Sequence, residues 1–191
     1  MDSQFSKLTV ICCIPGNRFS DKFLQSWTNT LQALQPKYNI YLSNKYSSQV
    51  NFARALCLGA NVLSGPNQLP FQGQIKYDVI VWLDSDMVFT PPMIDKLIEN
   101  CFYQHKIFSG IYAMEGGDML CCVENWDVDY YKKNGSFQFL SVKEGNEYIK
   151  NKNALRKCAY VGMGCMAIRY GVLEDERIKY PWFFRNITSF Q

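Results

Sequence analysis

The apolar run at residues 77–83, YDVIVWL, leads directly into Asp84-Ser85-Asp86 and constrains the fold of this chain more than any other segment. Its last five residues are apolar and rich in β-branched and aromatic side chains, which is typical of a strand buried on both faces. The two carboxylates that follow end the strand. The sequence therefore predicts a central strand whose carboxyl end carries charged side chains.

Strands and helices alternate before this segment. Residues 8–14 form a continuous apolar run that stops at Pro15-Gly16-Asn17, and residues 38–43 indicate a second strand. Ser20 and Asp21 open the helix between these strands, and Pro36 ends it. Its apolar face is expected to hold Leu24, Trp27, Leu31 and Leu34. Ser47 or Ser48 is expected to cap a second helix, whose apolar side would be formed by Phe52, Leu56, Ala60 and Leu63.

The alternation continues after the central strand. Residues 64–76 are expected to form a loop, and Thr90 is expected to cap a helix that begins with prolines. The inner face of that helix would be formed by Ile94, Leu97, Ile98 and Cys101. Residues 107–112 indicate another strand. This pattern predicts an α/β fold with a mostly parallel sheet flanked by helices, in which active sites lie at the carboxyl ends of the strands.

The second half of the chain is less regular. Residues 113–156 suggest loops and short strands, residues 160–168 form a glycine-interrupted apolar stretch, and residues 172–177 suggest a short helix. The length of 191 residues fits one domain with a full core. We therefore expect a single domain over 1–191, with a regular half at 1–112 and a loop-rich half at 113–191.

Composition excludes several classes of protein. The net charge of +3 is spread along the chain, which argues against a nucleic-acid partner but suits an anionic small ligand. No segment approaches the ~20 apolar residues of a membrane span, and the N-terminus with Asp2 does not resemble a signal peptide. Eight cysteines without a CxxC motif, and the single histidine His105, argue against a zinc site and favour the cytoplasm.

Asp84 and Asp86 are the strongest candidates for chemistry. On extended backbone, side chains two residues apart point to the same side, so both carboxylates can reach one point. Two such carboxylates repel each other, and a divalent cation removes that repulsion. Carboxylate oxygens suit Mn²⁺ or Mg²⁺, and such an ion can bridge to a diphosphate. A strand that simply ends in a polar turn is the simpler alternative.

The segment YDVIVWLDSDMVFTP resembles the strand and DxD turn of GT-A glycosyltransferases. Three more segments are similar to the same family: LTVICCIPGNR to its first strand and nucleotide-binding loop, NFARALCLGA to its helix near the donor, and YVGMGCMAIRYGVLE with YPWF to its acceptor side. The similarity is greatest to short domains from bacteria, phages and large DNA viruses, including viruses of algae. It spans most of residues 8–184, and only the DxD segment is specific by itself.

The resemblance implies a metal site and a donor site. Asp86 would bind Mn²⁺ or Mg²⁺ directly, and Asp84 would contact the metal, the ribose or metal-bound water. The implied donor-binding set is Pro15, Gly16, Arg18, Asn44, Arg54, Asp84, Ser85, Asp86, Gly162 and Gly164. Arg54 lies roughly opposite Phe52 on a helical wheel, which predicts a side chain outside the core.

The activity that the resemblance implies is transfer of a sugar from a nucleoside diphosphate donor, with UDP as the first choice, to a hydroxyl of a glycan or glycoprotein. Many such domains carry an acidic motif after the PWF segment, whereas this sequence ends at Gln191. We therefore expect further domains of a longer chain. The candidates for the catalytic base are Glu115 and Asp118, followed by Asp127 and Asp129.

Three other functions remain open. In a haloacid-dehalogenase-type phosphatase, Asp84 would be the nucleophile and Asp86 the acid/base. That family carries its DxD on the first strand, and it needs a second aspartate where this chain has Cys122 after Gly117-Asp118. A nucleotidyltransferase would show a glycine-rich loop with Lys or Arg, of which IPGNR is a faint version. A non-catalytic nucleotide-binding module would keep the site without turnover.

Overall fold

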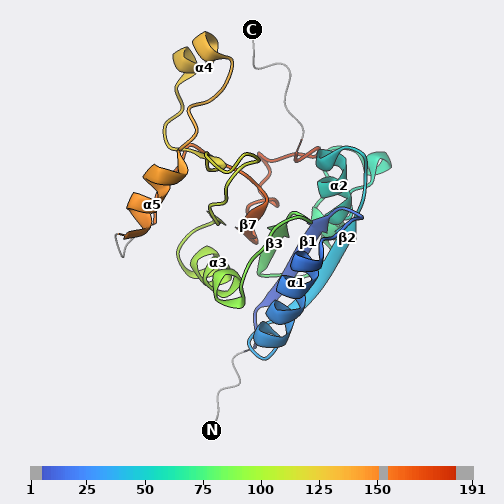
Figure 1. Ribbon diagram of the computed structural model, residues 1–191. Coiled ribbons are helices and arrows are strands. Elements are labelled where there is room, and N and C mark those ends of the chain that lie inside the picture. The colour runs from blue at the N-terminus through green and yellow to red at the C-terminus, as the bar shows by residue number, and fades with distance from the viewer. Residues whose placement is uncertain (1–5, 151–154, 184–191) are drawn as a thin grey trace. The chain divides into compact units, whose positions relative to one another are not determined.

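The computed structural model describes residues 6–150 and 155–183 (Figure 1). The chain divides into two compact units. The first comprises the described residues up to Phe108 and from Met166 onward, and the second is Ser109–Cys165. None of the helices in these described ranges combines the length and apolar character needed to cross a membrane.

A five-stranded sheet forms the centre of the fold, in the order β2-β1-β3-β7-β4. Its strands are β1 (Thr9–Pro15), β2 (Asn39–Lys45), β3 (Val79–Leu83), β4 (Ile107–Ser109) and β7 (Cys165–Arg169). β1 runs parallel to both β2 and β3. The backbone N–H groups of Tyr170 and Arg169, at the end of β7, donate to the carbonyls of Asp78 and Lys106, which precede β3 and β4. β7 is therefore antiparallel to both neighbours, and the sheet is mixed.

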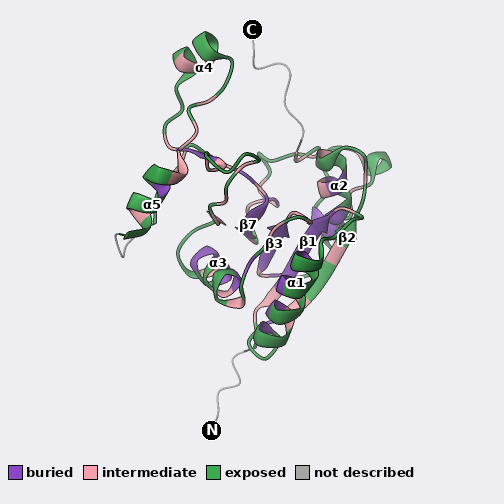
Figure 2. Cartoon of the chain, viewed as in Figure 1, coloured by how far each residue is buried: buried purple, intermediate pink, exposed green. Residues whose placement is uncertain are grey.

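The core lies along β1 and β3, as the apolar runs predict (Figure 2). All five residues of β3 are fully buried, and so are six of the seven in β1. β3 begins two residues later than expected, and Asp78, which precedes it, binds the start of β1: its carboxylate accepts from the N–H of Thr9 at 2.7 Å. The predicted α/β fold with a central sheet flanked by helices is confirmed.

Helix α1 (Asp21–Leu34) begins where predicted, and Ser20 caps it by accepting a hydrogen bond from the N–H of Phe23 at 3.0 Å. Its inner face differs from the prediction, because Leu24 is 53% exposed. The buried positions are Phe23, Ser26, Thr30 and Leu34. Leu34 is buried as predicted, whereas Trp27 and Leu31 are only half-buried and the small polar residues Ser26 and Thr30 are buried beside them.

Helix α2 (Val50–Cys57) begins after Gln49 rather than at Ser47 or Ser48. The predicted apolar side is wrong: Phe52 and Leu56 are exposed, and the helix ends before Ala60 and Leu63. The buried residues are Ala53, Ala55 and Cys57. These small side chains allow α2 to pack closely on β1 and β2. Two short 3₁₀ turns follow: η1 (Val62–Ser64) precedes the expected loop and reaches it only at Ser64, and η2 (Pro70–Gly73) lies within it.

Helix α3 (Pro91–Tyr103) follows Thr90 and starts with two prolines, as predicted. The four residues expected on its inner face are all buried: Ile94, Leu97, Ile98 and Cys101. The strand expected at 107–112 is shorter, since β4 covers only Ile107–Ser109. Residues 172–177 form turns rather than the expected helix.

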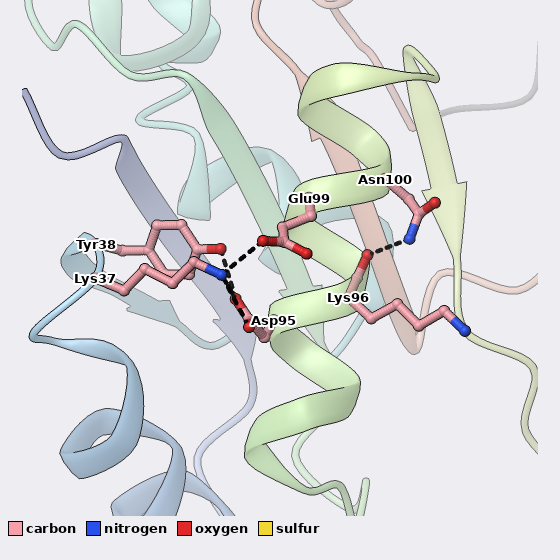
Figure 3. Close-up of polar contacts among 6 residues, drawn as sticks. All are labelled: Lys37, Tyr38, Asp95, Lys96, Glu99 and Asn100. Carbon is pink, nitrogen blue, oxygen red and sulfur yellow. Dashed lines mark hydrogen bonds and ion pairs between the residues drawn. The ribbon is translucent and has the colours of Figure 1, made fainter. Parts of the chain in front are cut away.

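A polar cluster connects the start of β2 with α3 (Figure 3). The ammonium of Lys37 lies 2.8 Å and 3.0 Å from the two carboxylate oxygens of Asp95 and 2.6 Å from Glu99. The hydroxyl of Tyr38 donates to the same Asp95 at 2.6 Å. Because Lys37 and Tyr38 directly precede β2, the cluster lies near the amino ends of the parallel strands.

The second unit contains a two-stranded antiparallel ladder of β5 (Cys122–Val123) and β6 (Tyr160–Val161). Short strands match the expectation for this region. The helices α4 (Val128–Asn134) and α5 (Val142–Lys150) were not predicted. Asp127 caps α4 by accepting from the N–H of Tyr130 at 2.8 Å.

Candidate functional site

The strand order creates a switch point between β1 and β3. The chain leaves β1 through α1 toward β2 on one side, and then returns through α2 to β3 on the other side. Right-handed crossovers in opposite directions place α1 and α2 on opposite faces of the sheet. Ligands of such folds bind outside the carboxyl ends of the strands at this point. Because Cys13 pairs with Trp82, Pro15-Gly16 and Asp84 follow at the same level.

Gly16 and Ser85 lie in direct contact at this switch point. Gly16 has a φ of +140°, and a Cβ atom there would lie 2.9 Å from the Oγ of Ser85. The N–H of Gly16 donates to the carbonyl of Lys45 at the end of β2, at 2.9 Å. Glycine is required here because the backbone passes too close for a side chain. The structure thus brings together two of the segments predicted to bind the donor.

Asn44 supports the same loop from β2. Its side-chain Nδ2 donates to the carbonyl oxygens of Ile14 at 2.6 Å and Gly16 at 2.8 Å. Both amide hydrogens therefore hold the end of β1 in place, and the side-chain carbonyl is the group left for a ligand. The contact with a base or ribose stays a prediction, while the supporting role is a finding.

Arg54 and Asp84 form an ion pair at the end of β3. The Nη2 of Arg54 lies 3.1 Å and 3.2 Å from the two carboxylate oxygens of Asp84. Only 16% of the arginine side chain and 31% of the aspartate side chain are exposed. Arg54 is half-buried and lies outside the core, as the helical wheel predicts, and its long side chain reaches from α2 to the end of β3. The Nε of Arg54 is buried and has no hydrogen-bond partner within the described residues.

Asp86 and Arg18 lie on the exposed side of the site. Asp84 opens a turn, in which the N–H of Met87 donates to the carbonyl of Asp84 at 3.1 Å. The expectation of an extended backbone through Asp84-Ser85-Asp86 was therefore wrong. Asp86 and Arg18 make no hydrogen bond or ion pair with the described residues, so both side chains are available to a ligand.

Asp84 and Asp86 offer oxygen ligands of the kind that hard divalent cations prefer, and a metal bound to them stays a prediction. Within residues 6–150 and 155–183, no group of three or more His, Cys, Asp or Glu side chains could hold a metal ion. The two carboxylates of the site are those of Asp84 and Asp86. Mg²⁺ commonly binds one or two protein carboxylates, while water and substrate phosphates supply its other ligands. Asp84 and Asp86 are therefore suited to an ion that arrives with a phosphate ligand.

Thiols near the site are not suited to bind that ion. Burial raises the pKa of Cys57 to about 11 and raises that of Cys13 well above its ordinary value. Both thiols therefore stay protonated at neutral pH, whereas a metal ligand must be a thiolate. The carbonyl of Cys57 instead accepts a hydrogen bond from the hydroxyl of Ser43 at 2.7 Å, which ties α2 to β2.

The segment at residues 181–183 reaches the central strand. The ring of Phe183 packs edge-to-face on Trp82 of β3, with centroids 5.3 Å apart. Trp82 is fully buried and stands two residues before Asp84. Phe184, the last residue of the predicted bulky segment, lies outside the described residues.

The remaining candidates belong to the second unit. A Cβ atom on Gly162 would collide with the hydroxyl of Tyr112 and the thiol of Cys121, and the N–H of Gly164 donates to that hydroxyl at 2.9 Å. Close packing within the unit therefore accounts for glycine at position 162. Glu115 and Asp118 are exposed.

No family model matches this chain, and no curated protein matches it. Among solved structures, the chain is similar to the protein A197 from STIV, with 11% sequence identity and a TM-score of 0.47. The alignment covers 88% of this chain and 68% of that protein. A similarity of this size supports no conclusion about activity.

Proposed function

We propose that this protein binds a nucleotide-sugar through a divalent cation at Asp84 and Asp86 and transfers the sugar to a hydroxyl of a glycan or glycoprotein. The observation that carries this proposal is the approach of Gly16 to Ser85 at the switch point. It brings a backbone loop without a side chain against the turn that carries Asp84 and Asp86. A loop without a side chain leaves room for a nucleotide to approach, and a cation at the carboxylates would neutralise its diphosphate.

Each residue of the site would have a distinct role. Bound Mn²⁺ or Mg²⁺ would supply positive charge to the diphosphate as it leaves. Asp84 and Asp86 would hold that ion, and the backbone at Pro15-Gly16 would line the nucleotide. Arg54 would add a fixed positive charge from α2, beside Asp84. UDP is the proposed nucleotide.

Glu115 or Asp118 is the proposed base that takes the proton of the acceptor hydroxyl. Both side chains are exposed. A retaining mechanism would need no such base. The cytoplasm is the proposed compartment, because all eight cysteines are free.

The phosphatase alternative is less well supported. Its nucleophile would be Asp84, yet a guanidinium nitrogen contacts both oxygens of that carboxylate. Such a contact stabilises the carboxylate and lowers its nucleophilicity. A non-catalytic nucleotide-binding module would use the same donor site, and only turnover separates it from the transferase.

Calorimetric titration of UDP into the protein, first with Mn²⁺ and then with EDTA, tests the proposal. We expect binding that needs the metal and that disappears in the double variant Asp84→Ala/Asp86→Ala, which should remain folded by circular dichroism. The matched control is Glu99→Ala/Glu176→Ala, which removes the same charge elsewhere. Hydrolysis or transfer from a panel of UDP-sugars then separates an enzyme from a binding module. Metal-independent binding, or full binding in the double variant, would refute the site.

A further inference from the structure

The Arg54–Asp84 pair occupies the carboxylate that the proposed function assigns to a metal ion. One nitrogen, Nη2, reaches both oxygens of Asp84, and both side chains are largely shielded from water. Asp84 can bind a cation by giving up this contact or by sharing its oxygens with it. In either case the positive charge of Arg54 lies beside that of the ion.

A free divalent cation is therefore disfavoured at this site. It would face the like charge of Arg54 across a poorly solvated contact, where electrostatic repulsion is weakly screened. It would also leave the guanidinium without its carboxylate partner, while the buried Nε already has no partner within the described residues. A buried donor without an acceptor is costly.

A cation that arrives with a diphosphate changes this balance. The phosphate oxygens bring negative charge and hydrogen-bond acceptors, and the planar guanidinium is well suited to bind both. The N–H groups of Arg54 could then bind the diphosphate when Asp84 binds the ion. The unpartnered Nε is one more donor for such an anion.

We propose that Arg54 competes with free cations for the carboxylate of Asp84, and that Asp84 binds a cation only when that cation carries a diphosphate. The site would then accept the metal–nucleotide complex as one ligand, rather than a metal followed by a nucleotide. This inference rests on the proposed function for the identity of the ligand. The competition between Arg54 and the ion is separate from it and can be measured without a nucleotide.

The test uses the full chain as wild type, Arg54→Met and Arg54→Lys, with Arg177→Met as the control. Arg177 is 83% exposed and pairs with Asp175, so the control makes the same exchange outside the site. Three constants are measured for each protein by calorimetry: Mn²⁺ alone, UDP with EDTA, and UDP with saturating Mn²⁺. The factor by which Mn²⁺ tightens UDP binding must equal the factor by which UDP tightens Mn²⁺ binding.

We expect a strong coupling in the wild type, toward the upper part of the usual range of about 5- to 150-fold. Arg54→Met should bind Mn²⁺ alone about 10-fold more tightly and UDP with Mn²⁺ more weakly, so that the coupling falls to a few-fold. Arg54→Lys keeps the charge, and its affinity for Mn²⁺ alone should stay nearer that of the wild type. Arg177→Met should match the wild type in all three constants.

Several results would overturn the inference. Unchanged or weaker binding of Mn²⁺ alone to Arg54→Met would show that the arginine does not compete with the ion. Equal Mn²⁺ affinities in the Met and Lys variants would assign the effect to shape rather than charge. A wild type that binds Mn²⁺ equally well with and without UDP would refute the coupling even if a variant fails to fold. A wild type that binds no UDP, combined with tighter Mn²⁺ binding by Arg54→Met, would refute the proposed function and leave the competition standing.

Discussion

Gly16 and Ser85 meet where the loop after β1 touches the turn after β3: a Cβ atom on Gly16 would lie 2.9 Å from the Oγ and 3.1 Å from the Cβ of Ser85. Gly16 also has a φ of +140°, which side-chain-bearing residues rarely adopt. Two independent constraints therefore require glycine at this position. The contact fixes the spacing between the backbone loop and the carboxylate turn.

Replacement of Gly16 by alanine should weaken metal-dependent UDP binding at least about 10-fold and destabilise the fold by about 1–3 kcal/mol. The double variant Gly16→Ala/Ser85→Gly removes the collision but not the backbone strain, so it should recover part of both losses. Gly65→Ala is the control for strain alone, because Gly65 has a φ of +70° and no atom within 4 Å of its Cβ position. Titration with UDP and urea unfolding measure both effects, and no recovery in the double variant would contradict the contact.

The two aspartates of the site should differ in their effect on stability. Asp84→Ala leaves the largely buried Arg54 without its partner and should cost about 2 kcal/mol in the free energy of unfolding. Asp86 is exposed and makes no such contact, so Asp86→Ala should change that free energy by less than about 0.5 kcal/mol. Urea unfolding in EDTA compares the two variants. Equal losses would show that the ion pair does not contribute to folding.

Stability should fall at alkaline pH because the core contains buried thiols. Burial raises the pKa of Cys12 and of Cys101 to about 12, whereas a thiol in the unfolded chain titrates near about 8.5. The folded state therefore holds these protons more tightly. Their contribution is complete below about pH 8.5 and is lost as the pH rises toward 12, by up to about 1.4 kcal/mol per pH unit for each thiol.

Urea unfolding at several pH values between about 8.5 and 10.5 tests this expectation. Cys12→Ala should make the decline of stability with pH less steep. Val10→Ala is the control, because it opens a similar space in the same buried strand without removing a titrating group. An equal decline in Cys12→Ala and the wild type would show that this thiol does not titrate differently in the folded state.

The cluster around Asp95 should stabilise the junction of α3 with the start of β2. Asp95 accepts from both Lys37 and Tyr38, and its carboxylate is the main cause of a raised pKa of Lys37. Asp95→Asn should cost about 1 kcal/mol, since it removes the ionic part of two hydrogen bonds. The loss should shrink in 1 M NaCl, where the Debye length is about 3 Å. A loss that does not change with salt would assign the effect to packing instead.

Local sequence patterns determine the central strands and one helix. β1 and β3 follow from continuous apolar runs, and α3 follows from its prolines and its evenly spaced apolar residues. The inner faces of α1 and α2 could not be predicted in full in the same way, because small side chains make part of the contact of α1 and all of that of α2. Ser26 turns inward and its hydroxyl accepts a hydrogen bond from the N–H of Phe89 at 3.3 Å, and α2 buries two alanines. The spacing of apolar residues does not predict tertiary contacts that are made by small side chains.

The candidate site, like the fold, could be predicted only in part from the sequence. The meeting of Pro15-Gly16 with Asp84-Ser85-Asp86 follows from two parallel neighbours that end at one edge of the sheet. The pairing of Arg54 with Asp84 does not, because it depends on how far a flexible side chain reaches across from α2. The polar turn at Asp84 matches the simpler alternative reading of the sequence, and the extended backbone expected through Asp86 was wrong, since alternation of side chains applies only while the backbone stays extended.

The second unit begins at the end of β4 and ends at the start of β7, and these two strands are neighbours in the sheet. The end of β4 and the start of β7 are held together by the N–H of Gly110, which donates to the carbonyl of Cys165 at 2.8 Å. The entropic cost of closing a segment between two fixed ends rises only with the logarithm of the segment's length. A longer segment at this junction therefore costs little more than a short one. This junction can therefore host segments of very different size and composition without disturbing the strands that carry Gly16 and Asp84.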